Sequence, residues 1–203
     1  PIFSLRRTVR IVPGGRVQVS FTTAIADSRD QALALADKYH DYPGVTRAFE
    51  MAWTQSRVEL HHLNLTPDTA QHYQWLASTL VYNDARLRAR STILAHNQQG
   101  QPRLWAYGVS GDFPIVVVRI TGSGELSLVR ELLQAHEYWR LKGVAADLVI
   151  LNEHASGYLQ GIQDQILALC HATNAGAWLN RRGGIFVLRA DTMPTEDHIL
   201  FQT

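Results

Sequence analysis

The spacing of hydrophobic residues changes character near residue 100. Beyond that point, short apolar runs alternate with longer amphipathic segments. The apolar runs are Ile115–Ile120, Asp147–Leu151 and Ile185–Leu188, and the amphipathic segments between them are Gly124–Leu141 and Tyr158–Ala172. Continuous β-branched runs that alternate with helices are typical of parallel strands joined by right-handed crossovers. The pattern therefore predicts an α/β layer built as β-α-β-α-β.

The first 25 residues have a different pattern. Two β-rich runs, residues 3–12 and 16–24, lie on either side of the turn sequence Pro13-Gly14-Gly15. This arrangement predicts a β-hairpin over residues 2–25. Because a lone hairpin is only marginally stable in water, we expect these strands to join a sheet that the rest of the sequence does not supply.

Helical patterns fill the segment between these two parts. Asp27 or Ser28 can cap a first helix, which Pro43-Gly44 is expected to end, and a second helix is expected over residues 49–60. A third helix has a strong start signal in Thr66-Pro67-Asp68, which combines a capping hydroxyl, a first-turn proline and a carboxylate favoured by the helix dipole. The polar stretch after this region, residues 97–102, predicts a loop.

These elements predict a mixed α+β chain in three parts. Residues 1–26 are expected to be the terminal hairpin of a β-sandwich, residues 27–100 a helical linker region, and residues 101–203 an α/β domain. The chain begins within a strand-like run and ends within a helical pattern, residues 195–201. We therefore expect it to be an internal piece of a larger protein.

Composition narrows the classes of partner. Hydrophobic residues make up 46% of the chain and charged residues 18%, as in ordinary globular proteins. A formal net charge of +1 argues against nucleic acid as a partner. Cys170 is the single cysteine, so an internal disulfide is excluded. No apolar run is long enough to span a bilayer, so we expect no direct membrane contact from this segment.

Two sequences resemble catalytic motifs without completing them. His136-Glu137 begins like a zinc-protease helix motif, but Arg140 occupies the position of the second histidine, so we expect no metal site and a helix with a buried Trp139 or Tyr138. Cys170 and His171 are sequence neighbours on a helix, and their side chains diverge; we interpret the cysteine as a small buried thiol. No cofactor is expected from these patterns.

A glycine-rich turn offers one functional alternative. Gly122, Gly124 and Ser127 follow a predicted strand and open a predicted helix, and Glu153 follows the next strand. This is the layout of a dinucleotide site, with backbone N–H groups for the pyrophosphate and an acid for the ribose. Ser127 replaces the third glycine, and Glu153 lies further along than the usual spacing of about 20 residues. The other interpretation is a tight strand-to-helix turn.

A second candidate site is an aromatic group before the first apolar run. Trp105 and Tyr107 could stack on the C–H faces of sugars, and Asp112 could accept hydrogen bonds from sugar hydroxyls. The alternative is that these side chains plug the junction between linker and sheet. Exposed aromatic rings would favour contact with glycan, and buried rings would favour the plug.

Several runs, taken in order along the chain, resemble the cyclic β-1,2-glucan synthases. The most specific of them is Leu104–Val116, and it is followed by Leu132–Gly143, Asp147–Glu153 and Phe186–Asp191. The N-terminal run Ile2-Phe3-Ser4-Leu5-Arg6-Arg7 resembles a closing hairpin of a sandwich domain in the same family. The resemblance covers nearly the whole chain and is weakest between Gly161 and Arg182.

The resemblance implies a very large inner-membrane glycosyltransferase that builds β-1,2-linked glucose chains from UDP-glucose and closes them into rings. It also implies a region similar to the family 94 glycoside phosphorylases, whose catalytic aspartate lies in a helical barrel. No barrel motif is present here, so no catalytic residue is assigned, and the fragment is expected to be inactive alone.

Two hypotheses follow from these observations. The first is a non-catalytic scaffold or carbohydrate-guiding segment, itself soluble, on the cytoplasmic side of a membrane-anchored parent. Its partners would be other domains of that parent and β-1,2-glucan, and the unpaired hairpin edge would favour self-association. The second is a small nucleotide-binding α/β enzyme centred on the turn from Gly122 to Ser127.

Overall fold

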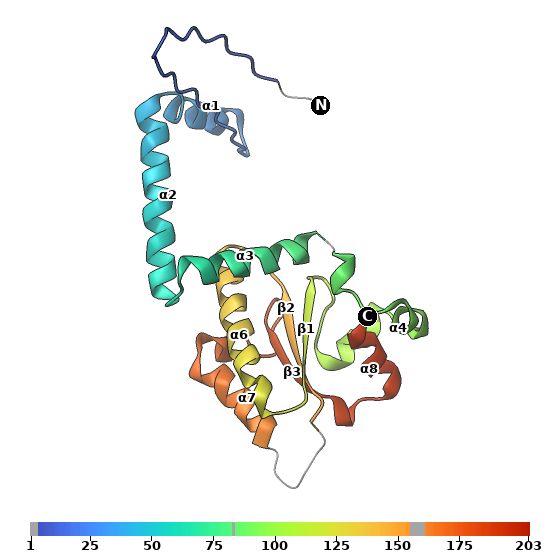
Figure 1. Ribbon diagram of the computed structural model, residues 1–203. Coiled ribbons are helices and arrows are strands. Elements are labelled where there is room, and N and C mark those ends of the chain that lie inside the picture. Colours follow the sequence, from blue (N-terminus) through green and yellow to red (C-terminus); the bar gives the residue numbers. More distant parts are fainter. Residues whose placement is uncertain (1–3, 83, 155–160) are drawn as a thin grey trace. The chain divides into compact units, whose positions relative to one another are not determined.

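The computed structural model describes residues 4–82, 84–154 and 161–203 of the chain (Figure 1). The chain divides into two compact units, residues 1–61 and residues 62–203. The three-part organisation expected from the sequence concerns the domains of a larger protein, and it stays a prediction.

The N-terminal unit begins with extended chain around the predicted turn. Gly14 has a φ of +74°, and the Gly15 N–H donates to the Val12 carbonyl at 2.8 Å, so the turn is confirmed. Residues 4–26 form no strand, however, so the predicted hairpin pairing is not formed there, and Ile2 and Phe3 lie outside the described residues. Apolar side chains of these runs are exposed, as at Leu5 (76%) and Phe21 (62%). Without a sheet to bury that surface, two strands gain too little from pairing with each other.

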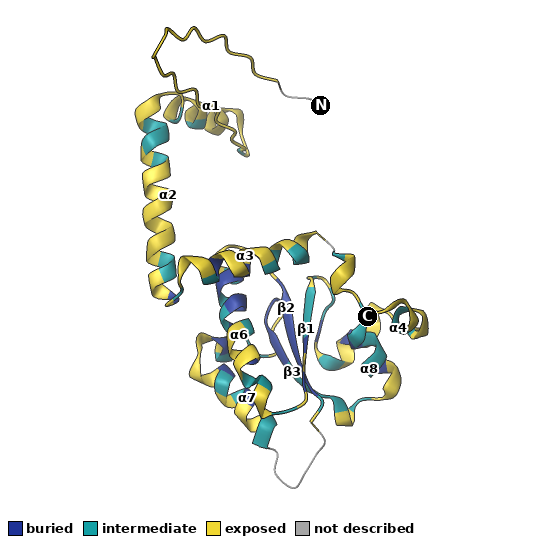
Figure 2. Cartoon of the chain, viewed as in Figure 1, coloured by how far each residue is buried: buried dark blue, intermediate teal, exposed yellow. Residues whose placement is uncertain are grey.

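Two helices complete this unit, α1 (Arg29–Lys38) and α2 (Tyr42–His62). The Ser28 hydroxyl accepts from the Gln31 N–H at 3.3 Å, which confirms the predicted cap. The prediction that Pro43-Gly44 ends a helix is wrong, because both residues lie in the first turn of α2. Proline is tolerated there, since first-turn N–H groups have no partner within the helix. Neither helix contains a buried residue (Figure 2).

The C-terminal unit is built on a three-stranded parallel sheet of order β1-β2-β3. Its strands are β1 (Ile115–Ile120), β2 (Asp147–Asn152) and β3 (Ile185–Arg189). The crossovers contain α6 (Leu126–Leu141) and α7 (Gly161–Ala172). The predicted β-α-β-α-β layer is therefore confirmed, while residues 158–160 of the second predicted helix lie outside the described residues.

The sheet is covered on both faces (Figure 1). Every residue of β2 is buried, which explains its uninterrupted apolar sequence. Helices α6 and α7 cover one face, where Val129, Leu133 and Ile166 pack against side chains of the strands. The opposite face is covered by Leu104, Val109 and Phe201, which precede β1 or follow β3. This second layer sets the position of the candidate aromatic group.

The remaining helices of the C-terminal unit lie outside the two crossovers. They are α3 (Pro67–Val81), α4 (Ser91–His96), α5 (Gln101–Leu104) and α8 (Thr195–Gln202), with short 3-10 turns at Ala85–Leu87, Trp105–Tyr107, Ser123–Glu125, Asn174–Trp178 and Ala190–Thr192. Helix α3 starts as predicted, with the Thr66 hydroxyl accepting from the Thr69 N–H at 3.2 Å. It is fixed to α6 by the buried Trp139, whose indole N–H donates to the Tyr73 carbonyl at 2.8 Å. Among the described helices, none combines the length and apolar character needed to cross a membrane.

Candidate functional site

The carboxyl ends of the strands are where ligands bind in many open α/β sheets. Glu153, which follows β2, is hydrogen-bonded there by an arginine and a histidine. It accepts from Arg119 Nε at 2.6 Å and Nη2 at 2.9 Å, and from His198 Nε2 at 2.8 Å. Burial raises the pKa of Glu153, but the hydrogen bonds from Arg119 and His198 outweigh it and lower the pKa overall. The carboxylate proposed for a ribose is therefore already occupied by an ion-paired cluster that joins β1, β2 and α8.

The glycine turn is also satisfied from within. Glu125 Oε2 accepts from the N–H of Thr121 at 2.5 Å and from that of Gly122 at 3.3 Å. These hydrogen bonds, led by that of Thr121, lower the pKa of Glu125 despite some desolvation. The carboxylate lies against amides that would face a pyrophosphate. A Cβ on Gly122 or Gly124 would meet no atom within 4 Å, so no close backbone approach requires these glycines.

The nucleotide site therefore stays a prediction, and binding of a nucleotide there would have to break hydrogen bonds that the fold already makes. A bound phosphate would have to displace Glu125, and a ribose would have to compete with Arg119 for Glu153. Ser127, the third member of that motif, is exposed in the first turn of α6. The alternative interpretation, a tight strand-to-helix turn, explains the same residues without displacing Glu125 or Arg119.

The aromatic group divides into two environments, and Tyr107 is its half-buried member. Its hydroxyl donates to Asp197 Oδ2 at 2.5 Å, and its ring contacts Phe201 edge-to-face with centroids 5.2 Å apart. Burial and the hydrogen bond to Asp197 raise the pKa of Tyr107 to about 12. Tyr107 thus joins the segment before β1 to helix α8.

Asp197 is the centre of this interior contact, and sequence reasoning missed it. Its side chain is fully buried, and it accepts from Arg103 Nε at 2.6 Å and Nη2 at 2.7 Å as well as from Tyr107. The fork of the guanidinium is the geometry preferred for a carboxylate. The sequence showed only an acid in the first turn of a helix, which predicts a favourable dipole interaction and gives no partner.

Trp105 and Asp112 lie at the surface. The Trp105 side chain is 61% exposed, and its indole N–H donates to the Ser110 carbonyl at 3.2 Å. Asp112 lies 3.1 Å from Arg182 Nη2 and accepts from Gln101 Nε2 at 3.4 Å. Gln101 also donates to the Ser110 carbonyl, at 2.9 Å, so both side chains are anchored on the loop before β1. An exposed ring beside hydrogen-bonding groups is the kind of surface that accepts a sugar ring.

The incomplete motifs have structural roles. His136 is buried, with Nε2 3.1 Å from the Ala146 carbonyl and 3.2 Å from that of Gly183, and desolvation lowers its pKa. Tyr138 and Trp139 are both buried, as expected, and burial raises the pKa of the Cys170 thiol to about 11. Within residues 4–82, 84–154 and 161–203, no three His, Cys, Asp or Glu side chains are placed to hold a metal ion.

Comparison with known proteins agrees with the resemblance seen in the sequence. Residues 1–42 match the supersandwich domain of glycosyl hydrolase 94, so the extended N-terminal runs lie in the matched part. Over 197 residues the chain is 38% identical to the cyclic beta-(1,2)-glucan synthase NdvB of Rhizobium meliloti. The matched region is 97% of this chain and 7% of that relative. The chain is therefore homologous to a short segment of a cyclic β-1,2-glucan synthase.

Proposed function

We propose that this chain is a non-catalytic segment of a protein that makes cyclic β-1,2-glucan, and that it guides the glucan over the surface formed by Trp105 and Asp112. One observation carries the proposal: Trp105 is 61% exposed although its indole N–H is fixed to the Ser110 carbonyl. A ring held in place before the ligand arrives loses little conformational freedom on binding. Asp112 is paired with Arg182 but is 47% exposed, so its carboxylate keeps acceptor capacity for hydroxyl groups.

A non-catalytic role is supported by the state of three carboxyl groups. Glu125, Glu153 and Asp197 are each engaged by hydrogen bonds within the fold, and each has a lowered pKa. A general acid for glycosidic chemistry needs a raised pKa so that it holds a proton near neutral pH. Burial raises the pKa of another carboxyl group, that of Asp147, but that side chain is fully buried and out of reach of a glycan. These three carboxyl groups therefore suit structural pairing better than proton donation.

The parent context is part of the same proposal. A glycosyltransferase anchored at the inner membrane would present this segment on the cytoplasmic side, where other domains of the parent would contact its N-terminal unit. The exposed extended runs of residues 4–24, within the region matched to a sandwich domain, suit pairing with such a domain.

Calorimetric titration of the chain with linear β-1,2-glucan oligosaccharides tests the proposal, with NADH as a parallel ligand. Calorimetry is preferred to fluorescence because the chain has 5 tryptophans. Trp105→Ala should weaken glucan binding by about tenfold or more, since aromatic stacking is worth roughly 1.5 kcal/mol. Trp75→Ala is the matched control, because Trp75 is a tryptophan of similar exposure (52%) on α3.

Equal glucan affinity in the wild type and Trp105→Ala would remove the glucan-guiding role. Absence of any glucan binding would also reject it and leave a scaffold. Binding of NADH without glucan would overturn the proposal in favour of the turn from Gly122 to Ser127.

A further inference from the structure

A groove of about 580 Å³ lies in the C-terminal unit, on the opposite side of β1 from its partner strand β2 and beside the end of α8. One wall is formed by β1 through Ile115, Val117 and Arg119, which alternate along the strand and so share a face. The other wall is the segment before α4, which contributes Arg88 and Arg90. No residue of the surface around Trp105 lines this groove.

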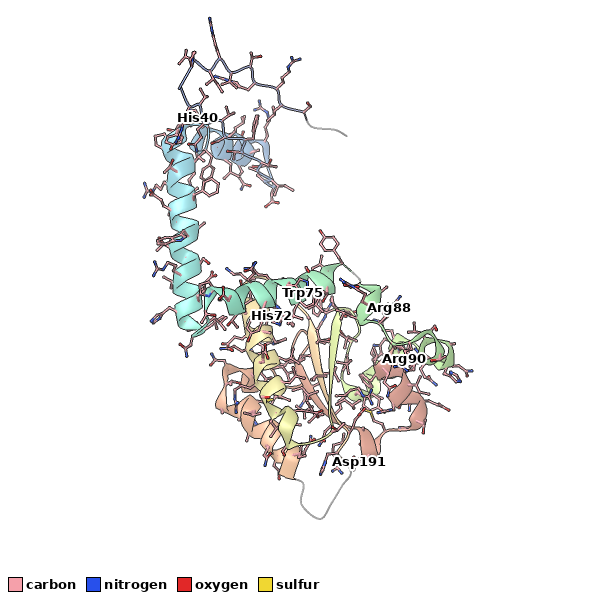
Figure 3. All side chains as sticks on the ribbon, viewed as in Figure 1. His40, His72, Trp75, Arg88, Arg90 and Asp191 are labelled. Carbon is pink, nitrogen blue, oxygen red and sulfur yellow. The ribbon has the colours of Figure 1, made fainter. Side chains whose placement is uncertain are left out.

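Arg88 and Arg90 belong to one short segment that lines the groove. Both residues have polyproline-like backbone, with φ/ψ of −81°/155° at Arg88 and −58°/148° at Arg90. Both arginines line the groove, and Figure 3 shows them on the chain that leads into α4. The groove therefore has two exposed arginines on one wall.

The residues that line the groove include three arginines and no Asp or Glu. Arg86 is bound to Asp84 at 2.7 Å and Arg119 to Glu153 at 2.6 Å, whereas the ion pairs of the described residues include neither Arg88 nor Arg90. Two arginines in the lining of one groove favour a dianion, which can pair with both of them. Guanidinium groups bind phosphate through two parallel hydrogen bonds.

The floor of the groove is apolar, with Ile115 and Val117 on β1 and Phe201 on α8. A ligand with an apolar or ring-shaped body can therefore cover this floor while its charged group stays at the arginines. We propose that the groove binds a small organic phosphate, with the phosphate held by Arg88 and Arg90 and the body placed on Ile115, Val117 and Phe201. A nucleotide and a phosphorylated sugar both have this chemistry. The inference is independent of the proposed glucan contact.

Calorimetric titration of the 203-residue chain with phenyl phosphate, inorganic phosphate and benzoate tests this inference. We expect phenyl phosphate to bind at least about tenfold more tightly than either reference, because each reference lacks the ring or the second charge. Arg88→Gln combined with Arg90→Gln should weaken phenyl phosphate binding by about tenfold or more. The matched control is Arg130→Gln combined with Arg181→Gln, which removes two exposed arginines outside the groove and so changes the net charge by the same amount.

Titrations with AMP and glucose 6-phosphate then distinguish a nucleotide from a phosphorylated sugar. The one that binds more tightly shows whether a nucleoside or a sugar fits the apolar floor. No binding of phenyl phosphate at millimolar concentration would overturn the inference. Equal weakening by the control variant and by Arg88→Gln combined with Arg90→Gln would also overturn it, because the attraction would then be general rather than local. Inorganic phosphate binding as tightly as phenyl phosphate would refute the role of the apolar floor.

Discussion

Replacing Asp197 with asparagine tests whether the contact between the segment before β1 and α8 is a main source of stability. The substitution keeps the size of the side chain and removes its charge. In the folded protein, the carboxylate accepts two hydrogen bonds from Arg103, at 2.6 and 2.7 Å, and one from Tyr107, at 2.5 Å. An amide has one acceptor oxygen, so at least one of these donors loses its partner.

The expected loss follows from the exposure of the partners. Removing one member of a fully buried ion pair costs about 3–5 kcal/mol. The Asp197 side chain is 0% exposed, but that of Arg103 is 44% exposed, so water can solvate the freed guanidinium. We therefore expect Asp197→Asn to lower the free energy of unfolding by about 2–3 kcal/mol. The melting temperature should fall by about 5–10 °C for a unit of this size.

Urea unfolding followed by circular dichroism gives the free energy directly. Asp164→Asn is the matched control, because Asp164 is exposed in the first turn of α7, and its replacement should change stability by less than about 0.5 kcal/mol. If Asp197→Asn were no more destabilising than Asp164→Asn, the buried contact would contribute nothing net and the reasoning would be wrong.

The pH dependence gives a second readout. Hydrogen bonds from Arg103, and then from Tyr107, hold the pKa of Asp197 below its usual value in spite of burial. A carboxyl group whose pKa is lowered on folding stabilises the fold above its unfolded pKa of about 3.9, and this stabilisation is lost as pH falls through the folded pKa. The difference between wild type and Asp197→Asn should therefore be full at pH 6 and shrink below about pH 4. A constant difference across that range would contradict an electrostatic origin.

Two further predictions concern packing and association. Gly184→Ala should destabilise the C-terminal unit by about 3 kcal/mol or more, because the new Cβ would lie 2.2 Å from the Trp178 carbonyl oxygen, whereas Gly124→Ala, with no atom within 4 Å, should be near neutral in thermal melts. Equal melting temperatures for the two variants would contradict this. The exposed apolar side chains of residues 4–24, including Leu5 (76%) and Phe21 (62%), should cause concentration-dependent self-association. Light scattering that shows a strict monomer at high concentration would exclude it.

Backbone elements of the C-terminal unit could be predicted from the sequence because their signals are local. The apolar run at Ile115–Ile120 matches β1 at both ends, and Thr66-Pro67 marks the start of α3. Burial on both faces leaves a strand with no polar alternation, and this signature persists whatever the neighbours are. The predicted pairing of the N-terminal hairpin is not formed because it depends on non-local contacts. Its two runs have strand-forming sequences, but a sheet that would bury them is not among the described residues.

Side-chain partnerships in the candidate site could not be predicted in the same way. Arg103 and Asp197 are 94 residues apart, and Arg119 and Glu153 are 34 apart, so their meeting depends on the topology of the sheet. Sequence reasoning placed Trp105 and Tyr107 in one aromatic group, yet one ring is exposed and the other is hydrogen-bonded to Asp197. Local spacing placed both rings near each other in the sequence. The packing of α8 against Tyr107, and not against Trp105, gives the two rings different environments, and spacing does not predict it.

The arrangement of α8 also connects the surfaces discussed above. Asp197 on this helix anchors Tyr107, His198 completes the pairing of Glu153, and Phe201 lies on the floor of the arginine groove. Loss of the Asp197 contact should therefore loosen one wall of the groove and, through Tyr107, the turn Trp105–Tyr107 as well. Phenyl phosphate and glucan binding should then both weaken in Asp197→Asn, whereas Arg88→Gln combined with Arg90→Gln should weaken phenyl phosphate binding alone. The arginine variant separates the two proposed surfaces because its residues line the groove and not the surface around Trp105, while α8 supports both.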